Sequence, residues 1–127
     1  MRNNLQDKRN KELEKIYQNI ISSSHVNINY MSTETILNMV ANHPAPRFYI
    51  TPKMAERYVL GFKRQDPAIL NSRKLPMILD LVEVYDKIVA RKKRDLRFVI
   101  WECVVQSAAK SFYVTPRRVR EIIFKYF

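Results

Sequence analysis

Apolar side chains recur every three or four residues along most of the chain, which is the spacing of helices that bury one face. Residues 5–23 open with charged side chains and then adopt this spacing, so they predict a first amphipathic helix that the serines at 22–24 end. The apolar positions of this helix are Leu13, Ile16, Tyr17, Ile20 and Ile21.

A second helix is predicted to follow a cap at Ser32 or Thr33. It should stop before residues 43–46, because the two prolines there lack a backbone donor and restrict the residues before them. A third helix is predicted to begin at Pro52, where Thr51 can cap the orphan amides and a proline loses no hydrogen bond.

The same signals return later in the chain at a fixed offset, because FYITPK at 48–53 recurs as FYVTPR at 112–117. A weaker echo relates residues 16–21 to residues 84–89 at a slightly longer offset. Self-similarity of this kind is typical of repeated supersecondary units. We therefore expect an all-α tandem duplication of a three-helix unit, divided into residues 1–66 and 67–127 and packed as one compact body.

The second copy opens after residues 63–75, which are predicted to form a connector or a short broken helix. A helix from Pro76 should turn Ile78, Leu81, Val82, Tyr85, Ile88 and Val89 inward. Asp80, Glu83, Asp86 and Lys87 should face solvent. The basic run 91–94 forms its exit, and cations there also suit the negative end of the helix dipole.

Composition excludes several classes of protein. Gly61 is the only glycine and no segment alternates with period two, so hairpins and glycine-rich phosphate loops are not expected. The net charge is +11, which favours a polyanionic partner, and the alternative is a solvated basic surface without a ligand.

The apolar positions around each threonine–proline pair are spaced as in the helix-turn-helix superfamily of DNA-binding domains, which each copy resembles over a short window. The matching positions are Ala109, Val114, Val119 and Ile122, and in the first copy Ala45, Ile50, Ala55 and Tyr58. Where the family usually has glycine at the turn, this chain has Tyr113 and Tyr49. The resemblance implies that the second and third helices of a copy pack together and that the third helix docks on DNA.

Basic residues fall where such a recognition helix would begin. Arg117 and Arg118 lie in its first turn and Arg120 one turn on, where they can hold phosphates or reach guanine edges. The first copy is weaker, since Lys53 and Arg57 flank an acid, and it is expected to act as a structural partner. The candidate DNA-binding residues are Arg117, Arg118, Arg120, Lys110, Lys53, Arg57, Arg91, Lys92, Lys93 and Arg94.

A helical wheel sustains a rival interpretation. It puts Phe124 opposite the apolar face of the last helix, and Leu60 is its counterpart in the first copy. These two residues are expected to join the copies or to bind another subunit or protein. The alternative function is a helical protein-interaction or virion assembly component with a basic surface.

No catalytic or metal-binding set is expected. His25, His43 and the single cysteine, Cys103, do not have ligand spacing, so we expect no metal, no cofactor and no enzymatic activity. Cys103 is expected to be buried among aliphatic neighbours. The aromatic pairs 48–49 and 112–113 are expected to anchor the core rather than to stack on bases.

No apolar run approaches the ~18 residues of a membrane span, and the N-terminus is polar, so we expect no membrane association and a cytoplasmic protein. The segment HPAPRFY at 43–49 resembles one in small uncharacterised proteins of gut bacteria and their tailed phages. That resemblance implies a phage or mobile-element DNA regulator, with DNA preferred to RNA, or a virion-associated protein.

Overall fold

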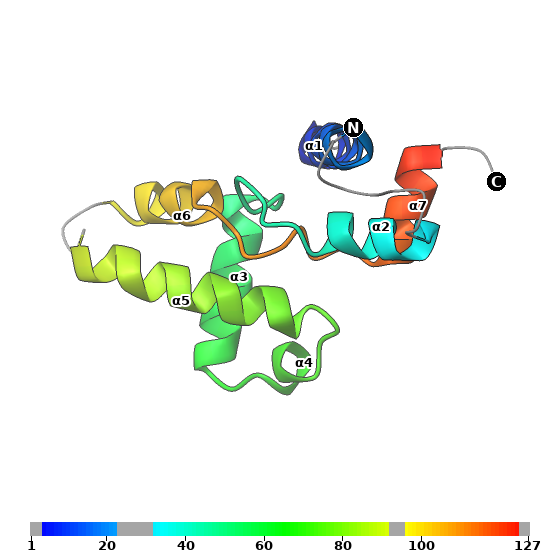
Figure 1. Ribbon diagram of the computed structural model, residues 1–127. Helices are drawn as coiled ribbons and strands as arrows, with labels where there is room; N and C mark the ends of the chain where they lie inside the picture. The colour runs from blue at the N-terminus through cyan, green and yellow to red at the C-terminus, as the bar shows by residue number, and fades with distance from the viewer. Residues whose placement is uncertain (1–3, 23–31, 92–95, 125–127) are drawn as a thin grey trace. The chain divides into compact units, whose positions relative to one another are not determined.

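A computed structural model describes residues 4–22, 32–91 and 96–124, and every regular element in these ranges is helical (Figure 1). This confirms the all-α class. The helices are α1 (Asn4–Ser22), α2 (Thr33–Ala41), α3 (Pro52–Lys63), α4 (Pro67–Leu70), α5 (Leu75–Arg91), α6 (Arg97–Gln106) and α7 (Pro116–Phe124).

Short polar side chains cap the helices at the predicted places. The Ser32 hydroxyl accepts from the backbone N–H of Thr35 at 3.1 Å and begins α2. The Thr51 hydroxyl accepts from the N–H of Met54 at 3.2 Å, and the Thr115 hydroxyl accepts from that of Arg118 at 3.1 Å. Each threonine is followed by proline as the first helical residue, so both predicted helix starts are confirmed.

Helix ends also follow local chemistry. The first helix stops at Ser22 and the second at Ala41, as predicted. At the end of α3 the N–H of Asp66 donates to the Gly61 carbonyl at 2.9 Å and that of Gln65 donates to the Phe62 carbonyl at 3.0 Å. This is the Schellman pattern, and Gln65 closes it with a φ of 59°, a conformation that favours glycine.

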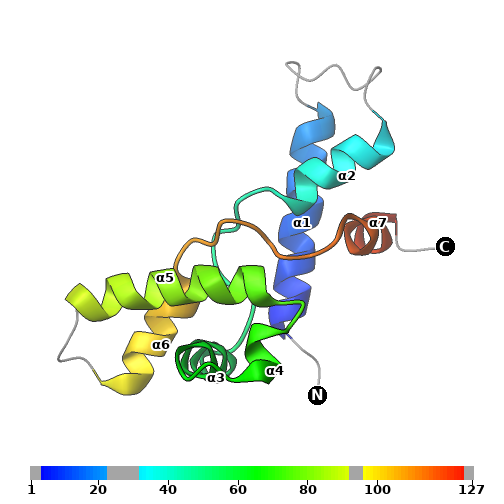
Figure 2. The same ribbon diagram turned by 90° about the horizontal axis from the view of Figure 1, so that it is seen from below.

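Contacts among the helices divide the chain into two units. Unit 1, made of Met1–His43 with Ser111–Phe127, contains α1, α2 and α7, each in contact with the other two. Unit 2, made of Pro44–Lys110, contains α3 to α6, in which α3, α5 and α6 contact one another and α4 packs on α3 (Figure 2).

This grouping differs from the expected division into residues 1–66 and 67–127. The third helix of each sequence copy, α3 or α7, packs with the first two helices of the other copy. The chain therefore passes between the units twice, after His43 and after Lys110. We call this packing crossed: α3 follows α2 in the chain but packs in unit 2, and α7 follows α6 but packs in unit 1.

Each unit buries its own apolar set, whose members come from all of its longer helices. In unit 1 the buried residues include Leu13, Ile16, Ile36, Leu37, Val40, Phe112, Val119 and Ile122. In unit 2 they include Phe48, Ala55, Tyr58, Val59, Ile69, Ile78, Leu81, Trp101, Val104 and Val105. Phe48 and Phe112 are core residues, as expected for aromatic anchors.

Two connecting segments meet at a single isolated bridge in unit 2. Ala45 and Ala109 exchange both backbone hydrogen bonds, at 3.0 and 2.9 Å, and the N–H of Phe48 donates to the Val105 carbonyl at 2.8 Å. The helix-turn-helix resemblance gave these alanines to a helix–helix contact. The structure instead uses their small side chains to let two extended connectors approach.

The turn that precedes α7 contains a strained residue. Tyr113 has a φ of 58°, as its place in the turn normally occupied by glycine demands, and its N–H donates to the Ser111 hydroxyl at 3.1 Å. Ser111 in turn donates to the carbonyl of Ala41 at 3.0 Å. Tyr49, the counterpart of Tyr113, does not have a positive φ, so the two turns differ at this position.

Two burial predictions were wrong. Asp80, expected in solvent, is only 4% exposed because its carboxylate accepts the backbone N–H of Lys110 at 2.9 Å. That bond gives the buried carboxyl group a partner and ties the connector to α5 at the place where the chain leaves unit 2. Cys103, expected in the core, is half-buried.

Candidate nucleic-acid interface

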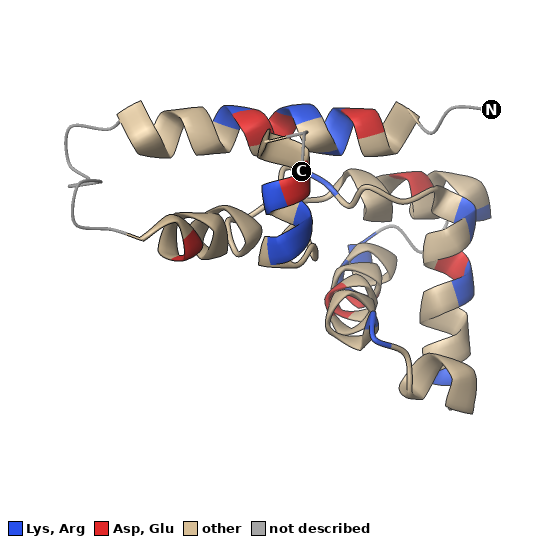
Figure 3. Cartoon of the chain, turned by 90° about the vertical axis from the view of Figure 1, so that its right-hand side faces the viewer, with Lys and Arg blue, Asp and Glu red and all other residues tan. Residues whose placement is uncertain are grey.

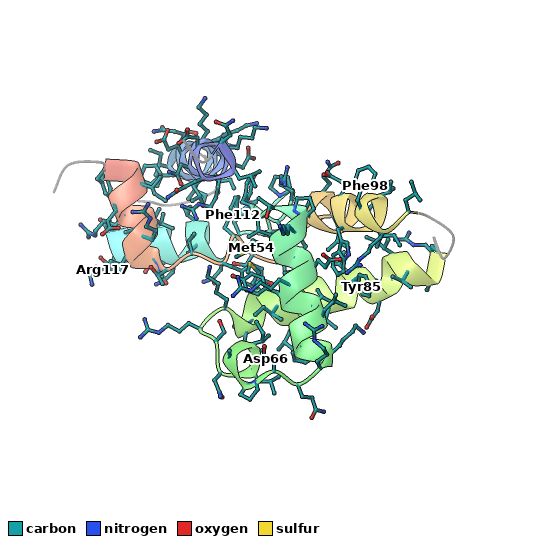
Figure 4. The ribbon with its side chains drawn as sticks, turned by 180° about the vertical axis from the view of Figure 1, so that it is seen from behind. Met54, Asp66, Tyr85, Phe98, Phe112 and Arg117 are labelled. Carbon is teal, nitrogen blue, oxygen red and sulfur yellow. The ribbon has the colours of Figure 1, made fainter. Side chains whose placement is uncertain are left out.

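The first turn of α7 carries the strongest candidate residues. Arg117 and Arg118 are exposed at the positive end of the helix, and the cap from Thr115 fixes that end. Arg117 is labelled on this helix in Figure 4. Arg117 forms no ion pair with any residue that the structure describes. Its guanidinium is therefore the most available cation of the predicted set in unit 1.

The other two arginines of α7 have acidic partners. Arg118 pairs with Glu121 at 3.1 Å on the same helix, and Arg120 pairs with Glu34 of α2 at 2.9 Å. Arg120 also lies 5.9 Å from the ring centroid of Phe124. Exposed pairs of this kind are worth about 0–1 kcal/mol, so a phosphate can displace the carboxylates at small cost.

In Figure 3, α1 carries both acidic and basic residues, whereas α7 carries more blue than red. The groove between α1 and α7 has a volume of about 580 Å³ and is lined by Asp7, Asn10, Lys11, Glu14, Arg118, Glu121 and Ile122. Its three acids outnumber its two bases, so this side of α7 does not suit a polyanion. The face that carries Arg117 suits it better.

Burial and a like charge act together on α1. Burial of the guanidinium, and then the neighbouring charge of Arg118, lower the pKa of Arg9 from its ordinary value. Two arginines from helices far apart in the sequence thus lie close enough to repel each other.

The α3 helix of unit 2 presents a smaller basic set. Lys53 and Arg57 are exposed in its first turns, and Glu56 between them pairs with Arg97 of α6. The start of α3 also borders an open groove of about 420 Å³, lined by Pro52, Lys53, Glu56, Arg97, Phe98 and Trp101. The Tyr85 and Trp101 rings stack beside it with centroids 4.6 Å apart, within unit 2.

Two further predicted cations, Lys110 and Arg91, have structural roles, and three are not described. Lys110 donates to Glu83 at 2.8 Å, which raises the pKa of Lys110, while hydrogen bonds from Lys110 and Lys87 lower the pKa of Glu83. Arg91 donates to the Lys87 carbonyl at 3.4 Å and ends α5. Lys92, Lys93 and Arg94 lie outside the described residues.

The two predicted interface residues are partly covered by the chain itself. The Phe124 ring packs edge-on against Tyr17 with centroids 6.0 Å apart, and Leu60 is half-buried. Phe124 of the second sequence copy thus contacts Tyr17 of the first copy, which is one of the two expected roles. Binding of another protein through Phe124 or Leu60 stays a prediction.

Sequence reasoning missed a different apolar surface. Phe98 is 66% exposed and Leu96 is 70% exposed, at the start of α6. The available signal was that α6 is apolar on all sides, which is more than one buried face requires. Figure 4 shows Phe98 at the edge of its helix.

No family model, curated protein or solved structure matches the chain. Within the described residues, no helix combines the length and the apolar character that crossing a membrane requires.

Proposed function

We propose that the chain is a non-enzymatic DNA-binding protein, a tandem duplication whose α7 supplies the main contacts and whose α3 supplies weaker ones. The observation that carries the proposal is the capped first turn of α7, which presents Arg117 and Arg118 at a helix N-terminus. The net charge of +11 supplies the long-range attraction.

In this proposal the arginines of α7 first contact the phosphates of the DNA backbone, and contacts with the bases follow. Arg117 holds one phosphate through its guanidinium and its backbone N–H, and Arg118 leaves Glu121 for a neighbouring phosphate. The Arg118–Glu121 pair that is given up is exposed and worth about 0–1 kcal/mol, so its loss opposes phosphate binding only weakly. The resemblance of residues 43–49 to proteins of gut bacteria and their phages fits a phage or mobile-element regulator.

The test is affinity for a random duplex pool at several salt concentrations. The logarithm of affinity should fall linearly with the logarithm of salt concentration, by about 0.9 for each phosphate neutralised. Joint Arg117→Gln, Arg118→Gln and Arg120→Gln substitutions should remove most of the affinity and flatten this slope. No detectable binding by the parent at low salt would end the proposal.

A control with equal charge loss separates a site from overall charge. Arg64, Arg73 and Lys74 are exposed around the α3–α5 connection, and joint replacement by glutamine removes the same three charges. This control should keep most of the affinity. If it weakens binding as much as the α7 variant does, only a general electrostatic attraction remains.

The second candidate is a helical protein-interaction or virion assembly component. Exposure of Phe98 and Leu96 favours it, since large apolar side chains seldom face water in pairs. Phe98→Ala and Leu96→Ala should then dissociate an oligomer or partner complex, measured by light scattering, and should leave DNA affinity unchanged.

A further inference from the structure

In each unit, one ion pair joins the second helix of one sequence copy to the third helix of the other copy. These are α2 with α7 in unit 1, and α6 with α3 in unit 2. In unit 1, Glu34 in the first turn of α2 accepts from Arg120 in the second turn of α7 at 2.9 Å. In unit 2, Arg97 at the start of α6 donates to Glu56 in the second turn of α3. Each pair lies within one unit, and both are exposed to solvent.

The two pairs occupy equivalent places with opposite signs. Glu56 and Arg120 are separated by the offset of the sequence repeat, and Arg97 follows Glu34 at one position short of the same offset. In unit 1 the acid is on the second helix and the base on the third. In unit 2 the base is on the second helix and the acid on the third.

The reversal matters because the repeat allows a second arrangement. If each copy folded on itself, α3 would pack on α2 and α7 on α6. Glu34 would then face Glu56, and Arg97 would face Arg120. Two attractions in the crossed arrangement would become two repulsions in the uncrossed one.

Apolar packing also bears on the choice between the arrangements, because the buried counterparts Leu37 and Trp101 differ in volume, as do Ala55 and Val119. Other core positions are closely matched. Val40 and Val104 are identical and fully buried counterparts on the second helices. On the third helices, Val59 and Ile123 are similar in shape. Exchanges between aliphatic residues of similar volume are tolerated in cores, so at these positions the two arrangements differ little. The reversed charges add an electrostatic difference between the arrangements.

We propose that the sign-reversed pairs Glu34–Arg120 and Arg97–Glu56 select the crossed arrangement of this chain over the uncrossed one. Each exposed pair is weak on its own. The two attractions in the crossed arrangement and the two repulsions in the uncrossed one nevertheless all favour the crossed arrangement. Together they give it a population on the order of tenfold larger. High salt should reduce that preference, because exposed charges are screened.

A charge exchange on the third helices tests the proposal without altering net charge. Glu56→Arg with Arg120→Glu makes both crossed pairs repulsive and both uncrossed pairs attractive. Adding Glu34→Arg and Arg97→Glu restores attraction in the crossed arrangement. The fourfold variant is therefore the matched control for the double variant.

The arrangement is measured with one nitroxide label on the exposed position Thr33→Cys, in a Cys103→Ser background. In the parent, amide signals of α7 should be broadened more strongly than those of α3. In the double variant, the broadening of α3 should rise and that of α7 should fall by several-fold. In the fourfold variant, the parent pattern should return.

Three results would overturn the proposal. The double variant could keep the parent pattern at low salt, or the fourfold variant could fail to restore it. The double variant could also lose its dispersed amide spectrum altogether. In that case the pairs stabilise the units without choosing between two arrangements.

Discussion

Ala45 and Ala109 donate their backbone N–H groups to each other's carbonyls, at 3.0 and 2.9 Å, although they are far apart in the sequence. They hold the same place in the sequence repeat, so equivalent points of the two connectors meet. Each is only 3% exposed, which leaves little room for a longer side chain. This reciprocal pair lies where the chain changes from one unit to the other.

Enlarging either alanine should therefore destabilise the protein. Ala45→Leu and Ala109→Leu should each lower the free energy of unfolding by about 1–3 kcal/mol through overpacking. Because the two residues share one site, the double variant should differ from the sum of the single ones. Urea denaturation measures all three, and additive losses would contradict a shared site.

Loss of either threonine cap should cost about 1 kcal/mol of unfolding free energy. Thr51→Ala leaves an amide of α3 without its acceptor, and Thr115→Ala does the same at α7. Thr→Ser at the same positions keeps the hydroxyl and should retain most of the stability. A Thr51→Ala protein as stable as the parent would mean that the cap is not formed in solution.

Replacing Gln65 should stabilise the chain. Gln65→Gly relieves a φ of 59° at an exposed position and should raise the free energy of unfolding by about 1 kcal/mol. The neighbouring Arg64 has a φ of −87°, so Arg64→Gly should destabilise and serves as the control. Thermal unfolding compares the two variants, and a lower midpoint for Gln65→Gly would argue against the Schellman turn.

Stability should depend on pH through Glu83 and Lys110. The pKa of Glu83 is lowered in the folded state, so its contribution is complete above the ordinary value of 4.5 and is lost as pH falls through the folded pKa. The pKa of Lys110 is raised, so its contribution is complete below 10.5 and is lost as pH rises through the folded pKa. Glu83→Gln should reduce both dependences in denaturation curves recorded across pH, and unchanged curves would contradict the pairing.

Contacts between residues close in the sequence predicted the helix boundaries. Contacts between residues far apart in the sequence could not be predicted in this way. The caps at Ser32, Thr51 and Thr115 involve residues three positions apart, so the sequence pattern contains all the information they need. Asp80 lies 30 residues from the N–H that it accepts, and no pattern within its own helix indicates that bond.

The crossed packing was hidden for the same reason. Apolar spacing shows which face of α3 or α7 is buried, yet both copies offer apolar second helices as partners. The wheel indicated that Phe124 would be covered but not by which helix, and in the structure its ring packs against Tyr17 of α1. The expected DNA contact through Arg117 stays a prediction.

The crossed packing also sets the order in which the two units can fold during synthesis. Unit 2 is one continuous stretch, Pro44–Lys110, and can close while the chain is still being made. The helices α1 and α2 emerge first, yet their core lacks Val119 and Ile122 until α7 follows. At ribosomal rates that interval is roughly ten seconds. The earliest-made helices are thus the last to be protected from proteases, and chaperones have their longest access to Leu13 and Leu37.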